Sequence, residues 1–277
     1  NAVTVTRAYD MLDRPTSING SNTTPVDYVL TYDTCTNGKG RVCTVTGTLP
    51  NSTTLSKSYV YGISGVPTSA VITTLGNTYT TSYQYNLSDQ VSKITYSNGA
   101  VVRTAFGDWA LPYKTYITLP GGVENLHATI DYHYSGQPEI ITITNGPTVT
   151  NVYDANKLYR KTSETVVQGS NTLSSFAYTY DNTNNITQIT EPGITKTYTY
   201  DDLYRLTQAV YTPTPGTPTT YTYAHNAIGN ITNANGLAYT YSSAGKINPH
   251  AVTTIGTSAY NYDVNGNMTS APNLVIT

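Results

Sequence analysis

Residues 198–207 read Tyr-Thr-Tyr-Asp-Asp-Leu-Tyr-Arg-Leu-Thr, and this stretch decides the fold. In an extended strand, residues two apart point to the same face, so Tyr198 and Tyr200 lie on one face and Thr199 on the other. Asp201 can accept hydrogen bonds from main-chain N–H groups two residues further on, which favours a reversal of the chain. The residues that follow alternate apolar and polar, as a returning partner strand does. The stretch therefore predicts one β-hairpin.

The same pattern recurs along the whole chain. Five close copies carry the tyrosines that we predict to be the structural residues of the repeat, namely Tyr178, Tyr180, Tyr198, Tyr200, Tyr221, Tyr223, Tyr239, Tyr241, Tyr260 and Tyr262. The copy at Tyr221 has one residue inserted, and weaker copies lie nearer the amino terminus. We call the residue before each acidic or polar turn the anchor, and place the twelve anchors at Tyr9, Tyr32, Tyr61, Tyr85, Phe106, Tyr134, Tyr153, Tyr180, Tyr200, Tyr223, Tyr241 and Tyr262. The eleven intervals from position 9 to position 262 average 23 residues, a period typical of stacked repeats.

A second set of turn signals lies between the copies, at Asn19-Gly20, Asn98-Gly99, Asn145-Gly146, Pro192-Gly193 and Asn235-Gly236. Each repeat is therefore predicted to be one hairpin, and twelve hairpins give about 24 strands. The proline-rich residues 213–218 are predicted to form an elongated hairpin loop at one rim. Because open twisted sheets seldom exceed about ten strands, we expect a curved, spiralling antiparallel sheet in the form of an open shell, tube or solenoid.

Composition supports an all-β chain and excludes several kinds of partner. The 277 residues include 52 Thr and 27 Tyr, and Thr, Tyr, Val and Ile favour strands. The net charge of −2 creates no cationic field that would attract nucleic acid. The apolar runs are far shorter than the roughly 20 residues that span a bilayer. We therefore expect neither nucleic-acid binding nor membrane insertion.

Two cysteines flank a glycine-rich turn. Cys35 and Cys43 lie eight residues apart around Asn37-Gly38-Lys39-Gly40, so the thiols can face each other across a hairpin. A disulfide is one reading, and it favours an oxidising, extracytoplasmic location. Two small buried cysteines without a bond are the other, because spacing alone does not fix bond geometry.

Residues 193–206 carry a family resemblance, and residues 260–268 repeat it. Both resemble the YD repeat of Rhs and YD-repeat proteins, whose pattern runs Gly, a few residues, then Tyr-x-Tyr-Asp-x-x-Gly-Arg-Leu. The resemblance implies a spiral β-sheet shell. In bacterial toxin complexes and Rhs effectors such a shell encloses a toxin, and in the teneurins it serves cell-surface adhesion. The self-cleaving segment and toxin of the effectors are not visible here, and those arrays are longer, so the chain resembles a section of wall.

Residues that commonly carry catalysis do not form a recognised motif. His127, His133, His225 and His250 are scattered, and no nucleophile elbow, phosphate loop or dinucleotide-binding motif is present. Residues 181–185 and 263–267 resemble half of a calcium loop, but they lack the later bidentate Glu and already serve as turn formers. We predict no enzyme activity, no cofactor and no metal.

The chain is interpreted as a single array over residues 1–277, with stronger repeats in 176–277 and more degenerate ones in 1–175. The predicted function is that of a non-catalytic structural segment of a secreted or cell-surface YD-repeat protein, which builds a β-shell that encapsulates or displays other parts. The alternatives are a fibre or tube subunit joined by edge-strand pairing, and an adhesin that binds a carbohydrate or receptor. Its expected partners are other segments of the same polypeptide or further copies of itself, outside the cell. The first residue, Asn1, suggests a processed product or a piece of a longer chain.

Overall fold

The computed structural model describes residues 5–20, 27–48, 53–241, 248–263, 265–272 and 274–275. Within these ranges the chain is almost entirely antiparallel β-structure, in one sheet of 23 strands and a second of three. Its one helical segment in the described ranges is the 3-10 turn η1 (Asp108–Ala110). The predicted all-β fold of tandem hairpins is confirmed. No helix of the described residues is long and apolar enough to cross a membrane.

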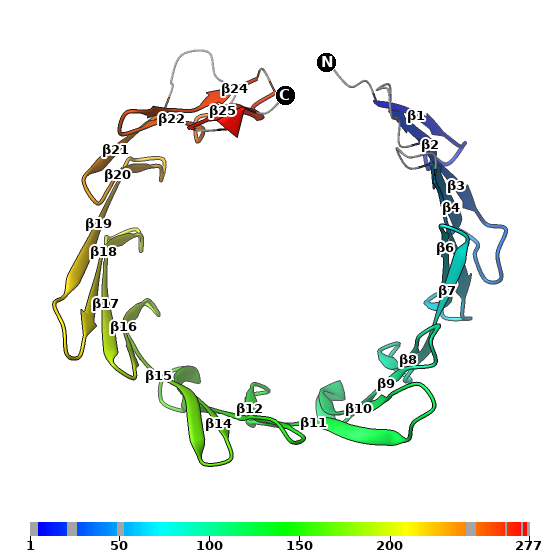
Figure 1. Cartoon of the computed structure of the whole chain (residues 1–277), viewed down its shortest axis with the longest axis horizontal. Coiled ribbons are helices and arrows are strands. Elements are labelled where there is room, and N and C mark those ends of the chain that lie inside the picture. The colour runs from blue at the N-terminus through cyan, green and yellow to red at the C-terminus, as the bar shows by residue number, and fades with distance from the viewer. Residues whose placement is uncertain are drawn as a thin grey trace. The chain divides into compact units, whose positions relative to one another are not determined.

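The chain divides into two compact units, Asn1–Pro147 and Thr148–Thr277. In the first unit each strand pairs with the strand that follows it. Its strands follow one another along an arc (Figure 1). They are β1 (Val5–Tyr9), β2 (Pro15–Gly20), β3 (Asp27–Tyr32), β4 (Val42–Thr48), β5 (Thr54–Tyr61), β6 (Pro67–Thr74), β7 (Asn77–Tyr85), β8 (Val91–Thr95), β9 (Val101–Phe106), β10 (Pro112–Thr118), β11 (Glu124–Tyr132) and β12 (Pro138–Ile143).

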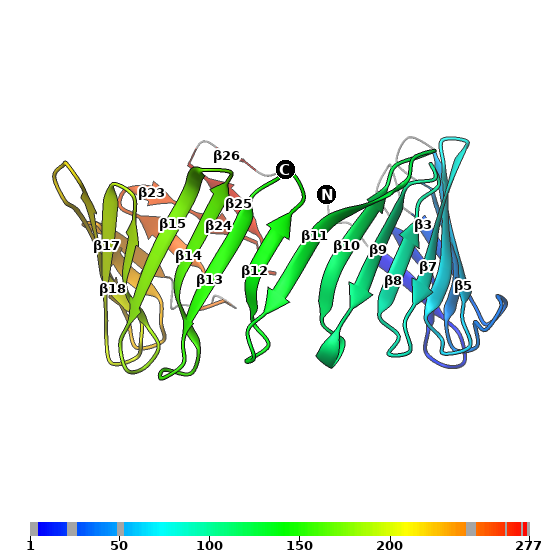
Figure 2. The same ribbon diagram turned by 90° about the horizontal axis from the view of Figure 1, so that it is seen from below.

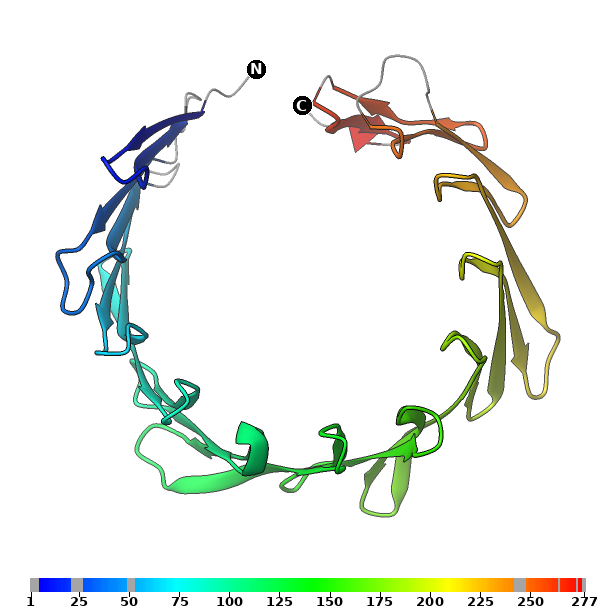
Figure 3. The ribbon, with the colours of Figure 1, turned by 180° about the vertical axis from the view of Figure 1, so that it is seen from behind.

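In the second unit consecutive strands also pair, except that among the described residues no pairing joins β23 to β24, and its strands also follow an arc (Figure 3). It contains β13 (Thr148–Asp154), β14 (Arg160–Gln168), β15 (Asn171–Tyr180), β16 (Ile186–Glu191), β17 (Ile194–Tyr200), β18 (Leu206–Pro213), β19 (Thr219–His225), β20 (Ile231–Ala234), β21 (Leu237–Tyr241), β22 (Val252–Ile255), β23 (Ser258–Ala259), β24 (Asn261–Tyr262), β25 (Met268–Ala271) and β26 (Leu274–Val275). The last three strands form the three-stranded sheet. Residues 214–218 connect β18 to β19 as a long loop, whereas Pro213, predicted to belong to that loop, is the last residue of β18 and pairs with Ile194.

The sheet is a single layer with very little interior. Among the described residues, the buried side chains are Cys43, Ala209, Asn151 and Asn230. Most other strand residues are half-buried, because each ring or aliphatic chain is covered only by neighbours on its own face. A thin wall of this kind is stabilised by cross-strand contacts rather than by a central core.

The two faces of the wall differ in composition. In β17, Tyr198 and Tyr200 are half-buried while Thr197 and Thr199 are exposed. The ten predicted repeat tyrosines are all half-buried, whereas the residue between each pair is exposed. On the threonine face the hydroxyls of Thr199 and Thr207 lie 3.1 Å apart, on neighbouring strands. The two-residue period of a strand therefore sorts rings to one face and hydroxyls to the other.

Each hairpin of the described chain has a β-bulge at its anchor, and the bulges correct two predicted anchors. At Tyr200, for example, Thr199 pairs with Gln208 but Tyr200 pairs with Leu206, so one residue of the return strand is unpaired. The equivalent shifts occur at Tyr132 and at His225, so the predicted anchors Tyr134 and Tyr223 were wrong.

The reason lies in the residue that follows each anchor. Tyr223 precedes Ala224, whose side chain cannot accept a hydrogen bond. His225 precedes Asn226, whose Oδ1 accepts the main-chain N–H groups of Ile228 and Asn230. In the other repeat Gly136 takes a positive φ of 84° at the fourth position of the turn that begins at His133. The turn chemistry, and not the nearest Tyr-x-Tyr, decides where the strand ends.

Candidate functional site

One five-residue turn recurs at the anchor end of the hairpins, and we call it the anchor turn. In the turn of residues 201–205 the N–H of Asp201 donates to the carbonyl of Arg205 at 3.0 Å, and the N–H of Tyr204 donates to the carbonyl of Asp201 at 2.9 Å. At the anchor end, the same two bonds close seven other described turns, at residues 10–14, 62–66, 86–90, 133–137, 181–185, 226–230 and 263–267. They also close two turns at the opposite end of the hairpins, at residues 96–100 and 143–147. The fourth residue has a positive φ in all eight anchor turns.

In six of the eight anchor turns the first residue is an aspartate or asparagine whose side chain caps the reversal. Asp201 Oδ1 accepts the N–H groups of Leu203 and Arg205, both at 2.9 Å. The equivalent pairs of bonds are made by Asp10, Asn86, Asp181, Asn226 and Asp263. These bonds satisfy main-chain N–H groups of the turn that would otherwise have only water as a partner.

The turn stabilises the ionised form of its aspartate. Burial raises the pKa of the Asp181 carboxyl, but hydrogen bonds from the Asn185 side chain and main chain and from Thr183 more than offset it and lower that pKa to about 2. The Arg205 side chain holds the pKa of Asp201 below its usual value, and Asn267 does the same for Asp263. These carboxylates are therefore charged throughout the neutral range.

The anchor tyrosine links its hairpin to the preceding one. The Tyr200 hydroxyl donates to the carbonyl of Ile186 at 2.7 Å, which is the first residue of the previous return strand. Six other described anchors donate in the same way to the preceding repeat, from Tyr32, Tyr61, Tyr85, Tyr132, Tyr180 and Tyr241. Burial raises the pKa of six of these seven hydroxyls, those of Tyr61, Tyr85, Tyr132, Tyr180, Tyr200 and Tyr241, so they remain protonated donors.

Two anchors lack a hydroxyl. Phe106 occupies the position in the first unit and His225 in the second. The Nδ1 atom of His225 is buried and has no hydrogen-bond partner among the described residues. Neither side chain can donate through a phenol, so these two joints between hairpins lack the bond that the tyrosines supply.

The residue at the end of the turn reaches in the opposite direction, to the next hairpin. Arg205 binds Asp201 through Nε at 2.7 Å and donates from Nη1 to the carbonyl of Asn226 at 2.7 Å. Arg160 donates to the carbonyl of Asp181 at 2.7 Å, and its guanidinium lies 5.6 Å from the centroid of the Tyr180 ring. Consecutive hairpins are thus tied at one rim by an anchor hydroxyl pointing backward and a side-chain arm pointing forward.

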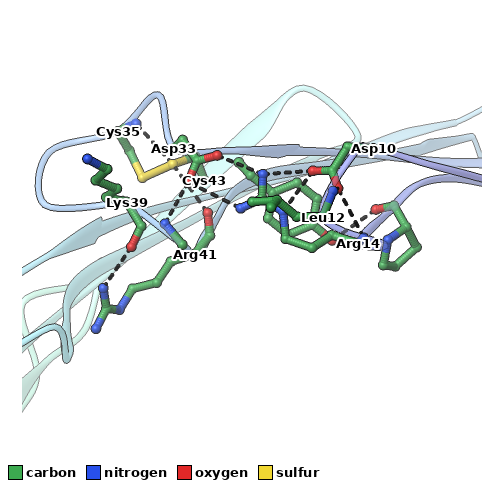
Figure 4. A network of polar contacts seen from close by, with 11 residues as sticks. Asp10, Leu12, Arg14, Asp33, Cys35, Lys39, Arg41 and Cys43 are labelled. Carbon is green, nitrogen blue, oxygen red and sulfur yellow. Dashed lines mark hydrogen bonds and ion pairs between the residues drawn. A yellow bond between two sulfur atoms is a disulfide. The ribbon is translucent and has the colours of Figure 1, made fainter.

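Figure 4 shows this joint between the first two hairpins. The Arg14 guanidinium lies 2.7 Å from carboxylate oxygens of both Asp10 and Asp33, which belong to successive turns. Hydrogen bonds from Arg14 lower the pKa of both carboxyls, and Gly40 also donates to Asp33 at 2.6 Å. The guanidinium also lies 4.3 Å from the centroid of the Tyr32 ring. One arginine therefore joins two turns and covers an anchor.

The structure places a disulfide between Cys35 and Cys43, with 5.4 Å between their Cα atoms. The loop that it closes contacts the next hairpin, because the N–H of Tyr61 donates to the carbonyl of Thr36 and Asn37 Nδ2 donates to the carbonyl of Tyr61. A side chain at Gly38 would lie 2.2 Å from the Cys35 sulfur, so only glycine fits beneath the bridge.

The remaining candidates for chemistry are not brought together. His133 lies beside Ser135 in its own turn, and His250 Nδ1 lies 2.6 Å from Asn230 Oδ1, in a different unit. The described residues contain no group of three or more His, Cys, Asp or Glu side chains that could hold a metal ion. In the two segments that resemble calcium loops, the Asp181 and Asp263 carboxylates accept hydrogen bonds from their own turns.

Reasoning from the sequence identified the tyrosines and the turn residues but missed the bonds between repeats. The signal was present in the spacing, because Ile186 follows the anchor Tyr180 by six residues, as Pro15 follows Tyr9 and Ile231 follows His225. That spacing does not show which tyrosine of the next hairpin donates to the carbonyl of the residue at that position.

Comparison with known proteins supports the fold. No protein-family model matches the chain, and no curated protein matches its sequence. Among solved structures, the chain is similar to TcdB2-TccC3 without its hypervariable C-terminal region, with a TM-score of 0.62 and 16% identity over 99% of this chain and 18% of that one. A TcdB2-TccC3-TEV structure matches at a TM-score of 0.62 and 15% identity, over 96% and 18% of the two chains.

The Photorhabdus luminescens Tc holotoxin pore, with the mutation TccC3-D651A, matches at a TM-score of 0.61 and 16% identity, over 96% of this chain and 18% of that one. The chain therefore spans about a fifth of the length of the solved chains that it resembles. The class of protein that the fold defines is a tandem-hairpin, YD-repeat-like β-sheet wall, and the fold expected from the YD-repeat resemblance is confirmed.

Proposed function

We propose that the protein is a non-catalytic wall segment of an extracellular, Rhs-like shell, which encloses or displays other parts of a larger assembly. The observation that carries this proposal is the repeated joint between hairpins, in which an anchor such as Tyr200 bonds backward and an arm such as Arg205 bonds forward. These bonds connect a hairpin to the one before it and to the one after it, and to no other. It suits a polypeptide whose task is to extend a sheet.

The physical properties of the wall agree with that role. Its described residues bury very few side chains, so the layer is thin and both faces are accessible. The similar solved structures are those of toxin complexes in which TcdB2-TccC3 takes part, and this chain aligns with them over almost its whole length. The proposal includes enclosure of a partner, secretion and the lack of catalysis.

The test uses the whole polypeptide in which this segment occurs. If the wall encloses other segments, limited proteolysis of the intact protein leaves those segments uncut, while the same segments expressed alone are digested. Tyr85→Phe combined with Tyr200→Phe weakens one hairpin joint in each unit and is expected to speed their digestion. Thr80→Ser combined with Thr222→Ser changes strand residues without touching a joint and serves as the matched control.

Two results would contradict the proposal. Equal digestion of the enclosed and free segments would show that nothing is shielded. A purified wall segment that turns over a substrate, and that loses turnover in a single-residue variant, would show that the protein is an enzyme.

A further inference from the structure

The anchor turns of the first unit carry a row of large apolar side chains that face solvent. The row consists of Met11, Leu12, Ile63, Leu87 and Trp109, with exposed fractions of 102%, 71%, 100%, 107% and 70%. Single exposed apolar residues are ordinary on protein surfaces, but here Met11, Leu12, Ile63 and Leu87 recur at the second or third position of the anchor turn. Trp109 lies in the turn at residues 107–111, which follows β9 at the same end of the hairpins but has a different hydrogen-bond pattern. Because these side chains recur along the turns, they can act together as one surface.

All of these side chains lie at one rim. The strands that precede the turns are β1, β5, β7 and β9, which alternate with antiparallel partners and so run in the same direction. Their turns therefore share one edge of the sheet. Figure 2 shows the turns after β7 and β9 at its lower edge. We call this edge the anchor rim.

The anchor rim has a fixed pitch. Each repeat adds two strands, so equivalent turns follow one another at about 9.6 Å. Five residues separate the strands at the turns after β1, β5, β7 and β9, so the apolar side chains lie at similar height. The nine-residue loop 33–41 after β3 lies between Leu12 and Ile63 in the row. At the opposite rim the turns also differ in length, as the short turn at Leu75 and the longer one from Leu119 to Val123 show. A second copy of this chain has turns at the same spacing, so its anchor rim is the best match for this surface.

The area is sufficient for a specific contact. From these exposed fractions the five residues together expose on the order of 900 Å², which compares with roughly 800 Å² that each partner contributes to an interface of standard size. The acidic side chains Asp13, Asp89 and Asp108 lie in the same turns and are exposed. Two facing rims would bring these carboxylates closer, so added salt should strengthen the contact by screening them.

We propose that the anchor rim of the first unit is an interface that binds the anchor rim of a second copy of this chain. A two-fold axis lets the same row meet itself with the two runs of turns in opposite directions, so both partners bury the same residues. The contact extends a wall beyond the height of one strand. This inference extends the proposed structural role. It rests on that role only in taking the anchor rim to be open to another molecule.

The test is sedimentation velocity of the 277-residue protein from about 1 to 100 µM, with hydrogen–deuterium exchange at both ends of that range. We expect a monomer–dimer equilibrium that shifts toward dimer with added salt, and protection at high concentration confined to residues 10–14, 62–66, 86–90 and 107–111. The triple variant Met11→Ser, Ile63→Ser, Leu87→Ser should weaken dimerisation by at least about 100-fold, since three truncated apolar contacts together are worth several kcal/mol.

The matched control is Leu75→Ser, Leu119→Ser, Val123→Ser, which removes three exposed apolar side chains from the opposite rim. Dimerisation should be unchanged in this variant, and circular dichroism should show that both triple variants are folded. A protein that stays monomeric, or a dimer lost only in the control, overturns the proposal. A monomer whose anchor rim is protected only by phosphatidylcholine vesicles also overturns it and assigns the row to lipid. If the protein stays monomeric but the intact protein still shields enclosed segments from protease, the result contradicts the rim contact and agrees with the proposed shell function.

Discussion

Tyr204 has a backbone conformation that costs energy for any residue except glycine. Its φ is 61°, at the fourth position of the anchor turn, where Gly65, Gly136, Gly229 and Gly266 stand in other repeats. A side chain in this left-handed region costs about 1 to 2 kcal/mol. Tyr204 is 60% exposed, so the ring recovers little by packing.

Replacing Tyr204 by glycine should therefore stabilise the protein. We expect Tyr204→Gly to raise the free energy of unfolding by about 1 kcal/mol, after allowance for the greater freedom of glycine in the unfolded chain. Urea denaturation followed by circular dichroism measures the change. Tyr204→Ala is the control, because it removes the ring but keeps the strained backbone. An equal gain in both variants would show that the ring, and not the backbone, is unfavourable.

The low pKa of Asp181 predicts a loss of stability in acid. Its folded-state pKa of about 2 lies below the value of about 3.9 of an unfolded aspartate, so its contribution is fully present above about pH 4 and is lost as the pH falls toward 2. Asp181→Asn should preserve the turn, since Asn86 and Asn226 cap equivalent turns with the same oxygen. The Asn185 amide can rotate to accept, as the Gln90 amide does from Asn86.

The measurement is the urea midpoint of the wild type and of Asp181→Asn at intervals from pH 7 to pH 2. We expect the variant to lose less stability than the wild type below pH 4, because one titrating carboxylate has been removed. The comparison isolates Asp181 from the other capped aspartates, which titrate in both proteins. Parallel curves for the two proteins would rule out the contribution.

The contribution of one anchor hydroxyl to the joint between two hairpins can be tested by removing it. Tyr200→Phe removes the bond to the carbonyl of Ile186 and leaves the ring in place. Deletion of one such hydrogen bond should cost about 1 kcal/mol of unfolding free energy. Tyr204→Phe, at an exposed position, is the control and should be neutral. The presence of Phe106 at an anchor shows that the ring alone is tolerated, so the protein should still fold.

Small residues also set how closely the strands' rings pack. Ala209 in β18 pairs with Tyr198 of β17 and with Tyr221 of β19, and it is 3% exposed. Ala209 is therefore flanked by tyrosines on both neighbouring strands, at a position with little free space. Ala209→Leu should therefore destabilise the protein by about 1 to 3 kcal/mol through overpacking. Thermal denaturation checks this against Ala224→Leu on the exposed face, and equal effects of the two would refute it.

At the scale of the whole molecule, stability should be nearly a sum over hairpins. The hydrogen bonds of the anchor tyrosines and of the turns join residues of the same hairpin or of adjacent ones, as the 14-residue separation of Tyr200 and Ile186 illustrates. In linear repeat proteins each repeat contacts only its neighbours, so stability is approximately a sum of repeat and interface contributions. Residues 1–147 expressed alone should thus show strand-type circular dichroism and cooperative unfolding. A random-coil spectrum would mean that the unit depends on the rest of the chain.

The sequence was sufficient for the hairpin period, the strand faces and most of the anchors. These depend on neighbours a few residues apart, since a strand alternates its faces and Asp201 caps N–H groups within its own turn. It misplaced two anchors because Tyr132-His133-Tyr134 and Tyr221 to His225 each offer aromatic rings at two registers. The choice between registers lies in the turn that closes, which periodicity alone does not show.

Only the tertiary structure decided what joins one hairpin to the next. The bond from Tyr200 to Ile186, the reach of Arg14 from Asp10 to Asp33 and the exposure of Leu87 at the rim all depend on distances across strands. Such distances arise from bulges, twist and the height of each turn, which add over several residues before two side chains meet. The sequence alone determined what each repeat is, because that is local chemistry. The folded wall decided which atoms of different repeats touch and which remain open to a partner.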